Sequence, residues 1–236
     1  MTRGWRPKEI SSLIAGVDGY TRGWIAATDC GNGNTKVETF GSFKNLLGRK
    51  ELAVIVVDVP IGLLAQGARK CDLLVRRFLG QPRASSLFPA PIRPMLVAQT
   101  WEQACRIRLQ VEGKKCSKQA AGIIPKVREV DDVMSPDLQA RVLEGHPEVS
   151  FAVMNGGEAL TFSKLTKKGR EVRLRLLARH FTDIESHLSA VPGAISDILD
   201  AYACLWTAQR VLSDCVRRFP PNARVDERGL RMEILA

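Results

Sequence analysis

The segment LAVIVVDVPIG, residues 52–62, constrains the fold more than any other part of the sequence. Its first six residues are apolar, and four of them are β-branched. A continuous run of this kind is typical of a strand that is buried on both faces of a sheet. Covering both faces takes layers of helices, so the run indicates the α/β class. The run closes on Asp58, Pro60 and Gly62, residue types that end strands and form turns.

Three shorter apolar segments before this run are expected to be strands. They are LIAGVDG at 13–19, WIAATDC at 24–30 and TKVETFGS at 35–42. The turn-rich segments YTRG and GNGN separate them, which predicts an antiparallel meander. SFKNLLGRKE, at 42–51, predicts a short helix before the central strand.

Helical patterns dominate the rest of the chain, with one more strand expected at EVSFAVMNG, residues 148–156. Predicted helices occupy residues 68–80, 100–113, 167–181 and 195–214, with a mixed helix and loop segment at 116–145. No internal repeat and no low-complexity linker divides the sequence. We therefore expect a single domain over residues 1–236, with a core at about 13–215 and a helical insertion at about 66–145.

The chain is strongly basic, with a formal net charge of +10 and a sequence pI near 9.6. Such a charge favours polyanionic partners, nucleic acid above all, although a soluble basic surface that binds none has the same charge. Aromatic residues are few and are not interleaved with basic ones, so recognition is expected through the phosphate backbone rather than the bases. The basic residues considered for phosphate contact are Arg69, Arg83, Lys118, Lys126, Arg128 and Lys164.

The six cysteines form no CxxC pair and have no histidine at ligand spacing, so neither a zinc site nor a disulfide framework is expected. Cys204 and Cys215 stand in apolar helical sequence and are expected in the core. The first residues, MTRGWRPKEISS, lack an apolar signal region, and no run of about 18 apolar residues occurs. These features predict a cytoplasmic protein without a membrane span.

Four aspartates stand at places where side chains of distant segments can meet. Asp18 and Asp58 each end an apolar strand, and Asp197 and Asp200 lie three positions apart at the start of the helix ISDILDAYAC. Residues three apart share a helix face, so the helical pair presents two like charges together. The alternative is structural, because Asp caps helices and forms Asp-Gly turns.

Eight sequence blocks, in order over roughly residues 13–212, resemble one family. They are GVDGYTRGWIAA, VVDVPIGL, RKCDLLVRRFLG, SSLFPAP, SKQAAGIIPKVREVD, GHPEVSFAVMNGG, SKLTKKGR and DILDAYACLWTA. The family is domain of unknown function 429, labelled predicted ribonuclease H-like nucleases. The order of strands and acidic residues also resembles the Holliday-junction resolvase branch of the ribonuclease H-like superfamily. Asp58 departs from that pattern, since the superfamily more often has Glu there.

The resemblance implies a ribonuclease H-like α/β fold. It consists of a mixed five-stranded sheet with the first three strands antiparallel, flanked by helices, with a helical insertion after strand four. It further implies a nuclease that hydrolyses phosphodiester bonds of DNA or RNA with two Mg²⁺ or Mn²⁺ ions. Asp18, Asp58, Asp197 and Asp200 are the expected ligands, because hard cations prefer carboxylates and a cluster of such charges is otherwise unfavourable.

Glu148 competes for the fourth ligand position, because it opens the expected last strand. His146, beside it, is considered as a proton shuttle or as an ordinary loop residue.

Two other functions stay open. One is a non-catalytic nucleic-acid-binding or protein-interaction module on the same fold. The other is an ATP-using phosphotransferase of the actin-like type, although the chain is short for the required duplication and offers only NGG at 155–157 as a phosphate loop. A symmetric junction as substrate would favour a homodimer.

Overall fold

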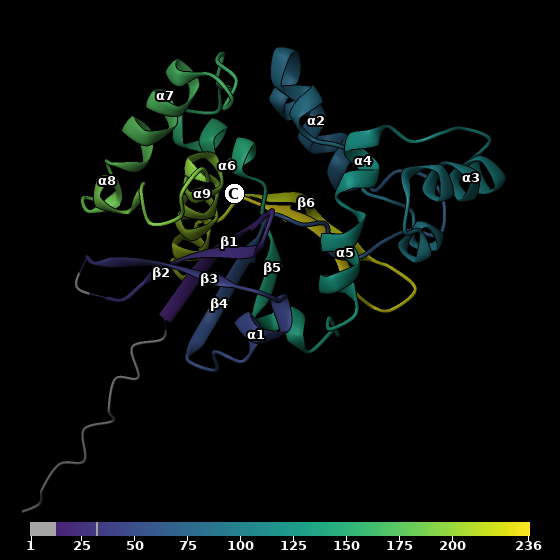
Figure 1. Cartoon of the computed structure of the whole chain (residues 1–236), viewed down its shortest axis with the longest axis horizontal. Helices are drawn as coiled ribbons and strands as arrows, with labels where there is room; N and C mark the ends of the chain where they lie inside the picture. The colour runs from purple at the N-terminus through teal and green to yellow at the C-terminus, as the bar shows by residue number, and fades with distance from the viewer. Residues whose placement is uncertain (1–12, 32) are drawn as a thin grey trace, which may run out of the picture.

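The computed structural model describes residues 13–31 and 33–236, and a mixed five-stranded sheet forms its centre (Figure 1). The strands are β1 (Leu13–Tyr20), β2 (Gly23–Asp29), β3 (Thr35–Phe40), β4 (Leu52–Val57) and β5 (Val142–Glu144). Their order across the sheet is β3-β2-β1-β4-β5. The first three strands pair antiparallel, and β1, β4 and β5 run parallel. The expected mixed α/β sheet is thus confirmed.

The apolar run at 52–57 is the interior strand β4, which lies between β1 and β5. Val54 and Val56 pack into the hydrophobic cluster on one face of the sheet. Ile55 and Val57 pack into the cluster on the other face. All four side chains are buried, so the strand is covered on both faces.

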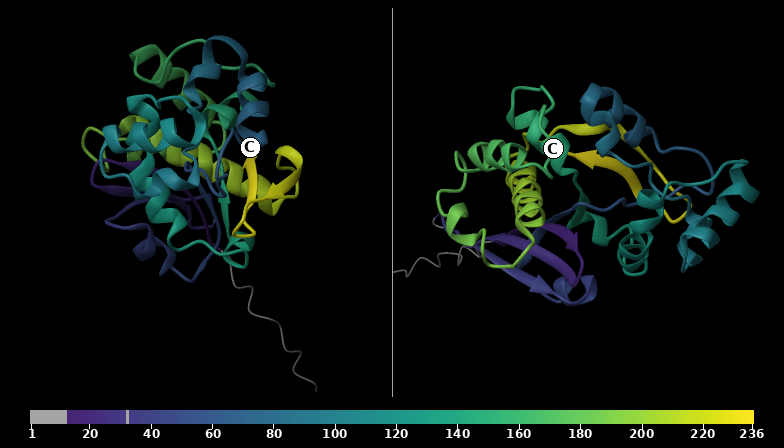
Figure 2. Two further views of the ribbon diagram at one scale, coloured as in Figure 1. Left: turned by 90° about the vertical axis from the view of Figure 1, so that its right-hand side faces the viewer. Right: turned by 45° about the horizontal axis from the view of Figure 1, so that its top comes forward.

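Two groups of helices surround the sheet, and Figures 1 and 2 show them on separate sides of the molecule. The helices are α1 (Phe43–Leu47), α2 (Lys70–Arg83), α3 (Trp101–Glu112), α4 (Lys118–Gly122), α5 (Ile124–Asp131), α6 (Pro147–Met154), α7 (Lys167–Leu177), α8 (Ile184–His187) and α9 (Ile195–Leu212). Buried residues of α6, α7 and α9 cover one face of the sheet, and residues of α1 and α5 cover the other. The elements α2 to α5 all lie between β4 and β5 in the chain.

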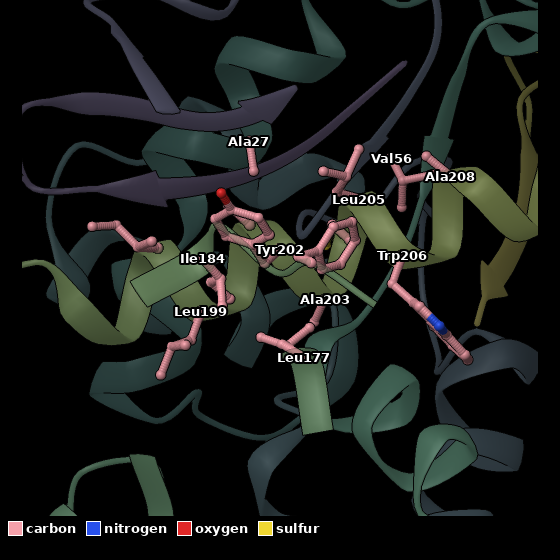
Figure 3. Packing of buried hydrophobic residues seen from close by; sticks show 14 of the residues in the cluster. Ala27, Val56, Leu177, Ile184, Leu199, Tyr202, Ala203, Leu205, Trp206 and Ala208 are labelled. Carbon is pink, nitrogen blue, oxygen red and sulfur yellow. The ribbon is translucent and has the colours of Figure 1, made fainter. Parts of the chain in front are cut away.

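The helix α9 fills the larger cluster, with apolar side chains on nearly all of its surface (Figure 3). Tyr202 and Leu205 of α9 pack near Ala27 of β2 and Val56 of β4. Burying a side chain of this size contributes about 1.5–3 kcal/mol. The Tyr202 hydroxyl also bonds to His187 Nδ1 at 2.7 Å, which ties α9 to α8.

Gly16 of β1 is the place where α9 comes closest to the sheet. A Cβ atom at this position would lie 1.9 Å from the amide nitrogen of Leu205 and 2.1 Å from the carbonyl oxygen of Ala201. Only a residue without a side chain allows this approach, so strand and helix touch backbone to backbone.

The prediction of a strand at 148–156 is wrong, because this segment forms the helix α6. Its apolar residues are buried on every side of the helix, so they show neither the helical nor the strand periodicity. Pro147 occupies the first turn, where a proline is compatible with a helix. The fifth strand is instead the three-residue β5, too short to produce a pattern.

The C-terminal part also differs from expectation. A two-stranded hairpin, β6 (Arg218–Val225) and β7 (Arg231–Leu235), follows α9. Cys204 is buried as expected, but Cys215 is exposed because α9 ends before it. All six cysteines lie in the described residues and are free.

No helix in residues 13–31 and 33–236 has both the length and the apolar character to cross a membrane. The expectation about the first residues, MTRGWRPKEISS, falls outside the described residues. The prediction of a single domain with an insertion remains a prediction.

We expect Gly16→Ala to lower the free energy of unfolding by about 3 kcal/mol, because the new methyl group overlaps backbone atoms that cannot move independently. Chemical denaturation measures the change. Gly41→Ala is the control, since a Cβ there meets nothing within 4 Å, and its effect should stay within about 0.5 kcal/mol. Equal stability of the two variants would refute the close contact between β1 and α9.

Candidate functional site

A cavity of about 770 Å³ lies where the parallel strands β1, β4 and β5 end, and we call it the central cavity. Asp18 near the end of β1, Asp58 just after β4 and Glu144 at the end of β5 all line it. Parallel strands present their carboxyl ends at one edge of a sheet, which explains why residues so far apart in the chain meet there. Glu148 of α6 and Asp200 of α9 add two more carboxylates from the helices.

Asp18 is 7 % exposed, and its Oδ1 accepts a hydrogen bond of 2.7 Å from the amide of Gly19. Burial raises the pKa of Asp18 well above its usual value, and the negative charges of Asp58 and Asp200 raise it further. These carboxylates are therefore close enough to oppose one another's ionisation.

Asp58 continues the line of β4, and its amide donates to the carbonyl of Val17 in β1 at 3.0 Å. Burial, followed by the charge of Asp200, raises the pKa of Asp58 to about 7. This carboxyl group thus changes its charge near neutral pH.

Asp200 is 1 % exposed and lies one turn inside α9, facing the cavity. One of its oxygens forms an ion pair with the ammonium group of Lys164. The other, Oδ1, is buried and has no hydrogen-bond partner among the described residues. Burial alone would lower the pKa of Lys164, but Asp200 and then Asp18 raise it above its usual value.

Asp197 lies in the first turn of α9 but does not act as its cap, since Ala194 holds the cap position without a side-chain bond. Burial and the charge of Asp200 raise the pKa of Asp197. Its side chain is not part of the cavity lining, so it stands at the margin of the cluster rather than within it.

His146 and Glu148 meet at the start of α6, where His146 is the N-terminal flanking residue. Both line the central cavity. One Glu148 oxygen accepts from Arg173 of α7, while Glu148 Oε2 and His146 Nδ1 are buried without a partner in the described part of the chain. Burial lowers the pKa of His146, so its imidazole is neutral at pH 7.

A buried ion-pair group in the cavity lining was not anticipated from the sequence. The Arg69 guanidinium donates to Glu144 at 2.7 and 2.8 Å, to Asp72, and to the carbonyls of Ile61 and Gly62. Arg69 is 3 % exposed, and the group ties the turn after β4 to the end of β5. Burial raises the pKa of Glu144 to about 7 even beside Arg69. The only sequence signal was the short run VLEG, in which an acidic residue again ends an apolar segment.

The basic residues considered for phosphate contact have different environments. Arg69, Arg83, Lys126 and Lys164 line the cavity. Lys126 is held in place by the carbonyl of Gly23 at 2.6 Å and by the ring of Trp24, 4.4 Å from its ammonium nitrogen.

Lys118 and Arg128 lie away from the cavity lining. The ammonium nitrogen of Lys118 stands 5.0 Å from the centre of the Trp101 ring. Arg128 donates to the carbonyls of Leu96 and Ala98. Their roles in contacting nucleic acid remain predictions.

Oxygen ligands suited to a hard cation are present in the cavity, and two of their atoms, Asp200 Oδ1 and Glu148 Oε2, have no partner within the described segments. As the side chains stand, no group of three or more His, Cys, Asp or Glu in residues 13–31 and 33–236 is arranged to hold a metal ion. The Lys164 ammonium is paired with Asp200 instead. The donor atoms are thus of the type that binds Mg²⁺ or Mn²⁺, while the observed side-chain positions bring Lys164 rather than a third carboxylate to Asp200.

A family model described as "Protein of unknown function (DUF429)" matches residues 16–225. The match covers most of the chain, which therefore belongs to this family. No curated protein and no solved structure matches the chain. The family description names no activity, so the cavity itself has to indicate the chemistry.

We expect Asp58→Asn to stabilise the protein increasingly as pH rises. The folded protein holds this proton up to about pH 7, whereas the unfolded chain releases it near pH 4, so the wild type loses stability between these values. Asp58→Asn has no carboxyl group at this position, so it does not lose stability in this way. Its gain in unfolding free energy should be close to zero at about pH 4 and on the order of 3–4 kcal/mol at about pH 8.

Chemical denaturation in the presence of a chelator, at several pH values, measures this difference. Asp137→Asn, at an exposed position away from the cavity, is the control and should show no such trend. A constant difference between Asp58→Asn and the wild type across this pH range would contradict the assignment.

Proposed function

We propose that this protein is a divalent-metal-dependent nuclease that hydrolyses phosphodiester bonds in DNA or RNA. The observation that carries the proposal is the convergence of Asp18, Asp58, Glu148 and Asp200, from four different elements, on one cavity. Burial and then neighbouring carboxylates raise the pKa of Asp18 and Asp58, and the ionisation of these two groups in the cavity destabilises the fold, a cost that a bound cation removes. Buried oxygens without partners, in the part of the chain described, support the same view.

The ribonuclease H-like resemblance supports the proposal from a separate direction. The sheet has the expected antiparallel first three strands, and acidic residues stand near the ends of β1, β4 and β5 and on the last long helix. The net charge of +10 favours a polyanionic substrate.

In the proposed mechanism Asp18, Asp58 and Asp200, with Glu148 or Asp197, hold two Mg²⁺ or Mn²⁺ ions. Bound metal would lower the pKa of a water molecule and neutralise the charge on phosphate oxygens. The water oxygen would bond to phosphorus while one P–O ester bond breaks, and the leaving oxygen would take up a proton from solvent water. The neutral imidazole of His146 accepts the proton that the water gives up.

Lys164 has a distinct part in this proposal. Its ammonium balances the carboxylates of the metal-free cavity, and its side chain, at 39 % exposure, has room to move outward. When it leaves Asp200, it is positioned to contact a phosphate of the substrate.

We expect Asp18→Asn with Asp200→Asn to abolish Mn²⁺ binding and to reduce cleavage at least about a hundredfold, because two of the shared ligands lose their charge. Calorimetry measures metal binding, and gel assays on single-stranded, branched and hybrid substrates measure cleavage. The variant should stay folded in chelator, because Asn has nearly the same shape as Asp at both positions.

Asp132→Asn with Asp137→Asn is the matched control, because both residues are exposed and away from the cavity. It should retain wild-type binding and cleavage. A wild type that binds no metal and cuts none of these substrates would refute the nuclease assignment and favour the non-catalytic binding module.

A further inference from the structure

The segment 83–88 forms a wall of the central cavity that the proposed chemistry leaves unused. Arg83, Ser85, Ser86 and Phe88 of this segment line the cavity together with the acidic residues. The segment leaves the line of α2 at Gly80, where the backbone is non-helical with φ of 56°. It therefore presents its side chains to the cavity.

This wall is anchored to the body of the protein. Leu87 is 5 % exposed and packs in the hydrophobic cluster that includes Cys71 and Val75 of α2. Its carbonyl accepts a hydrogen bond of 2.7 Å from Arg76. The side chains on either side of Leu87 are thus held at fixed positions.

Arg83 is the unusual residue of the wall. Its Nε is buried without a hydrogen-bond partner, and its guanidinium is in no ion pair within residues 13–31 and 33–236. Arg69, in the same cavity, has its donors occupied by two carboxylates and two carbonyls. A guanidinium fork with free donors at a cavity wall matches the geometry of a phosphate group.

Other side chains of the cavity lining have the chemistry to contact the sugar and base of a nucleotide. The hydroxyl of Ser86 lies near Arg83 in the lining and is able to donate to a phosphate or sugar oxygen, whereas the Ser85 hydroxyl donates to the carbonyl of Pro82 at 3.1 Å. Phe88 and Leu165, 38 % and 78 % exposed, offer apolar surface in the same lining, and an aromatic ring stacks on any base.

The size of the cavity limits what reaches the carboxylates. Its volume of about 770 Å³ is typical of sites that enclose small molecules. A duplex, whose major groove alone is about 12 Å wide, is far larger than such a space. Asp18 and Asp200 line this space and are themselves 7 % and 1 % exposed, so a ligand that occupies the cavity beside them is about the size of one nucleotide unit.

We propose that the central cavity binds one nucleotide unit, with its phosphate on Arg83 and Ser86 and its base or sugar against Phe88 and Leu165. The unit is either a free nucleotide or the end of a single strand. Cleavage of the strand end rests on the proposed nuclease function, whereas binding of the nucleotide does not. A nuclease with this site removes nucleotides from strand ends rather than cutting within a strand.

Calorimetric titration with a nucleoside monophosphate, with and without Mn²⁺, tests the binding site. Arg83→Gln should weaken binding at least about tenfold, because a charge-assisted pair is lost. Arg77→Gln is the matched control, since Arg77 is exposed on the same helix and is absent from the lining. Arg83→Lys keeps the charge but not the fork, and it should bind with intermediate affinity if Arg83→Gln folds poorly.

Equal nucleotide binding by Arg83→Gln, Arg77→Gln and the wild type would overturn the proposal. A second comparison, of linear and circular single-stranded DNA of one sequence, identifies the source of the unit. Release of mononucleotides from the linear form alone supports a strand end, and equal cutting of the circle overturns it. If neither form is cut but Arg83-dependent binding remains, the ligand is a free nucleotide and only the nuclease function fails.

Discussion

The contact between the backbones of β1 and α9 at Gly16 determines the positions of the acidic residues. Gly16 and Asp18 are two positions apart on a strand and so point to the same face of the sheet, the face that α9 covers. Ala201, which meets Gly16, directly follows Asp200 in α9. Bringing the two backbones together therefore brings the two carboxylates together. The site is a result of packing at one glycine as much as of the acidic residues themselves.

That packing places like charges in a buried space, and cationic side chains compensate them in two ways. In one part of the cavity lining, Arg69 compensates Asp72 and Glu144 through pairs that are fully buried. Pairs of this kind gain little net stability, but loss of one partner leaves a buried charge uncompensated. In another part, Asp200 pairs with Lys164, whose side chain is 39 % exposed. The first pairing is closed to solvent, whereas the cation of the second remains accessible to it.

Much of this organisation could be predicted from the sequence, because the apolar and turn patterns that indicate it extend over many residues. The run at 52–57 predicted an interior strand, and the meander and the long last helix followed from their periodicity and turns. Asp18, Asp58 and Asp200 were noticed because each stands at the end of a strand or inside an apolar helix, and the structure brings them to one cavity. The role of these residues is still a prediction.

The features that could not be predicted from the sequence were hidden for physical reasons. The strand β5 has three residues, so Glu144 could not be recognised as another strand-ending acid. The helix α6 is buried all round, and its apolar segment was mistaken for a strand. The environments of Arg69 and Arg83 also depend on tertiary contacts, since nothing local distinguishes an arginine paired with buried carboxylates from one with free donors.

The cavity draws its parts from two separate stretches of the chain. Its acidic floor comes from the sheet, α6 and α9, whereas the walls carrying Arg83 and Lys126 come from the residues between β4 and β5. Substitutions in this intervening stretch can therefore reshape the walls while the acidic residues of the floor keep their places. We expect sequence variation in the family to concentrate in that stretch.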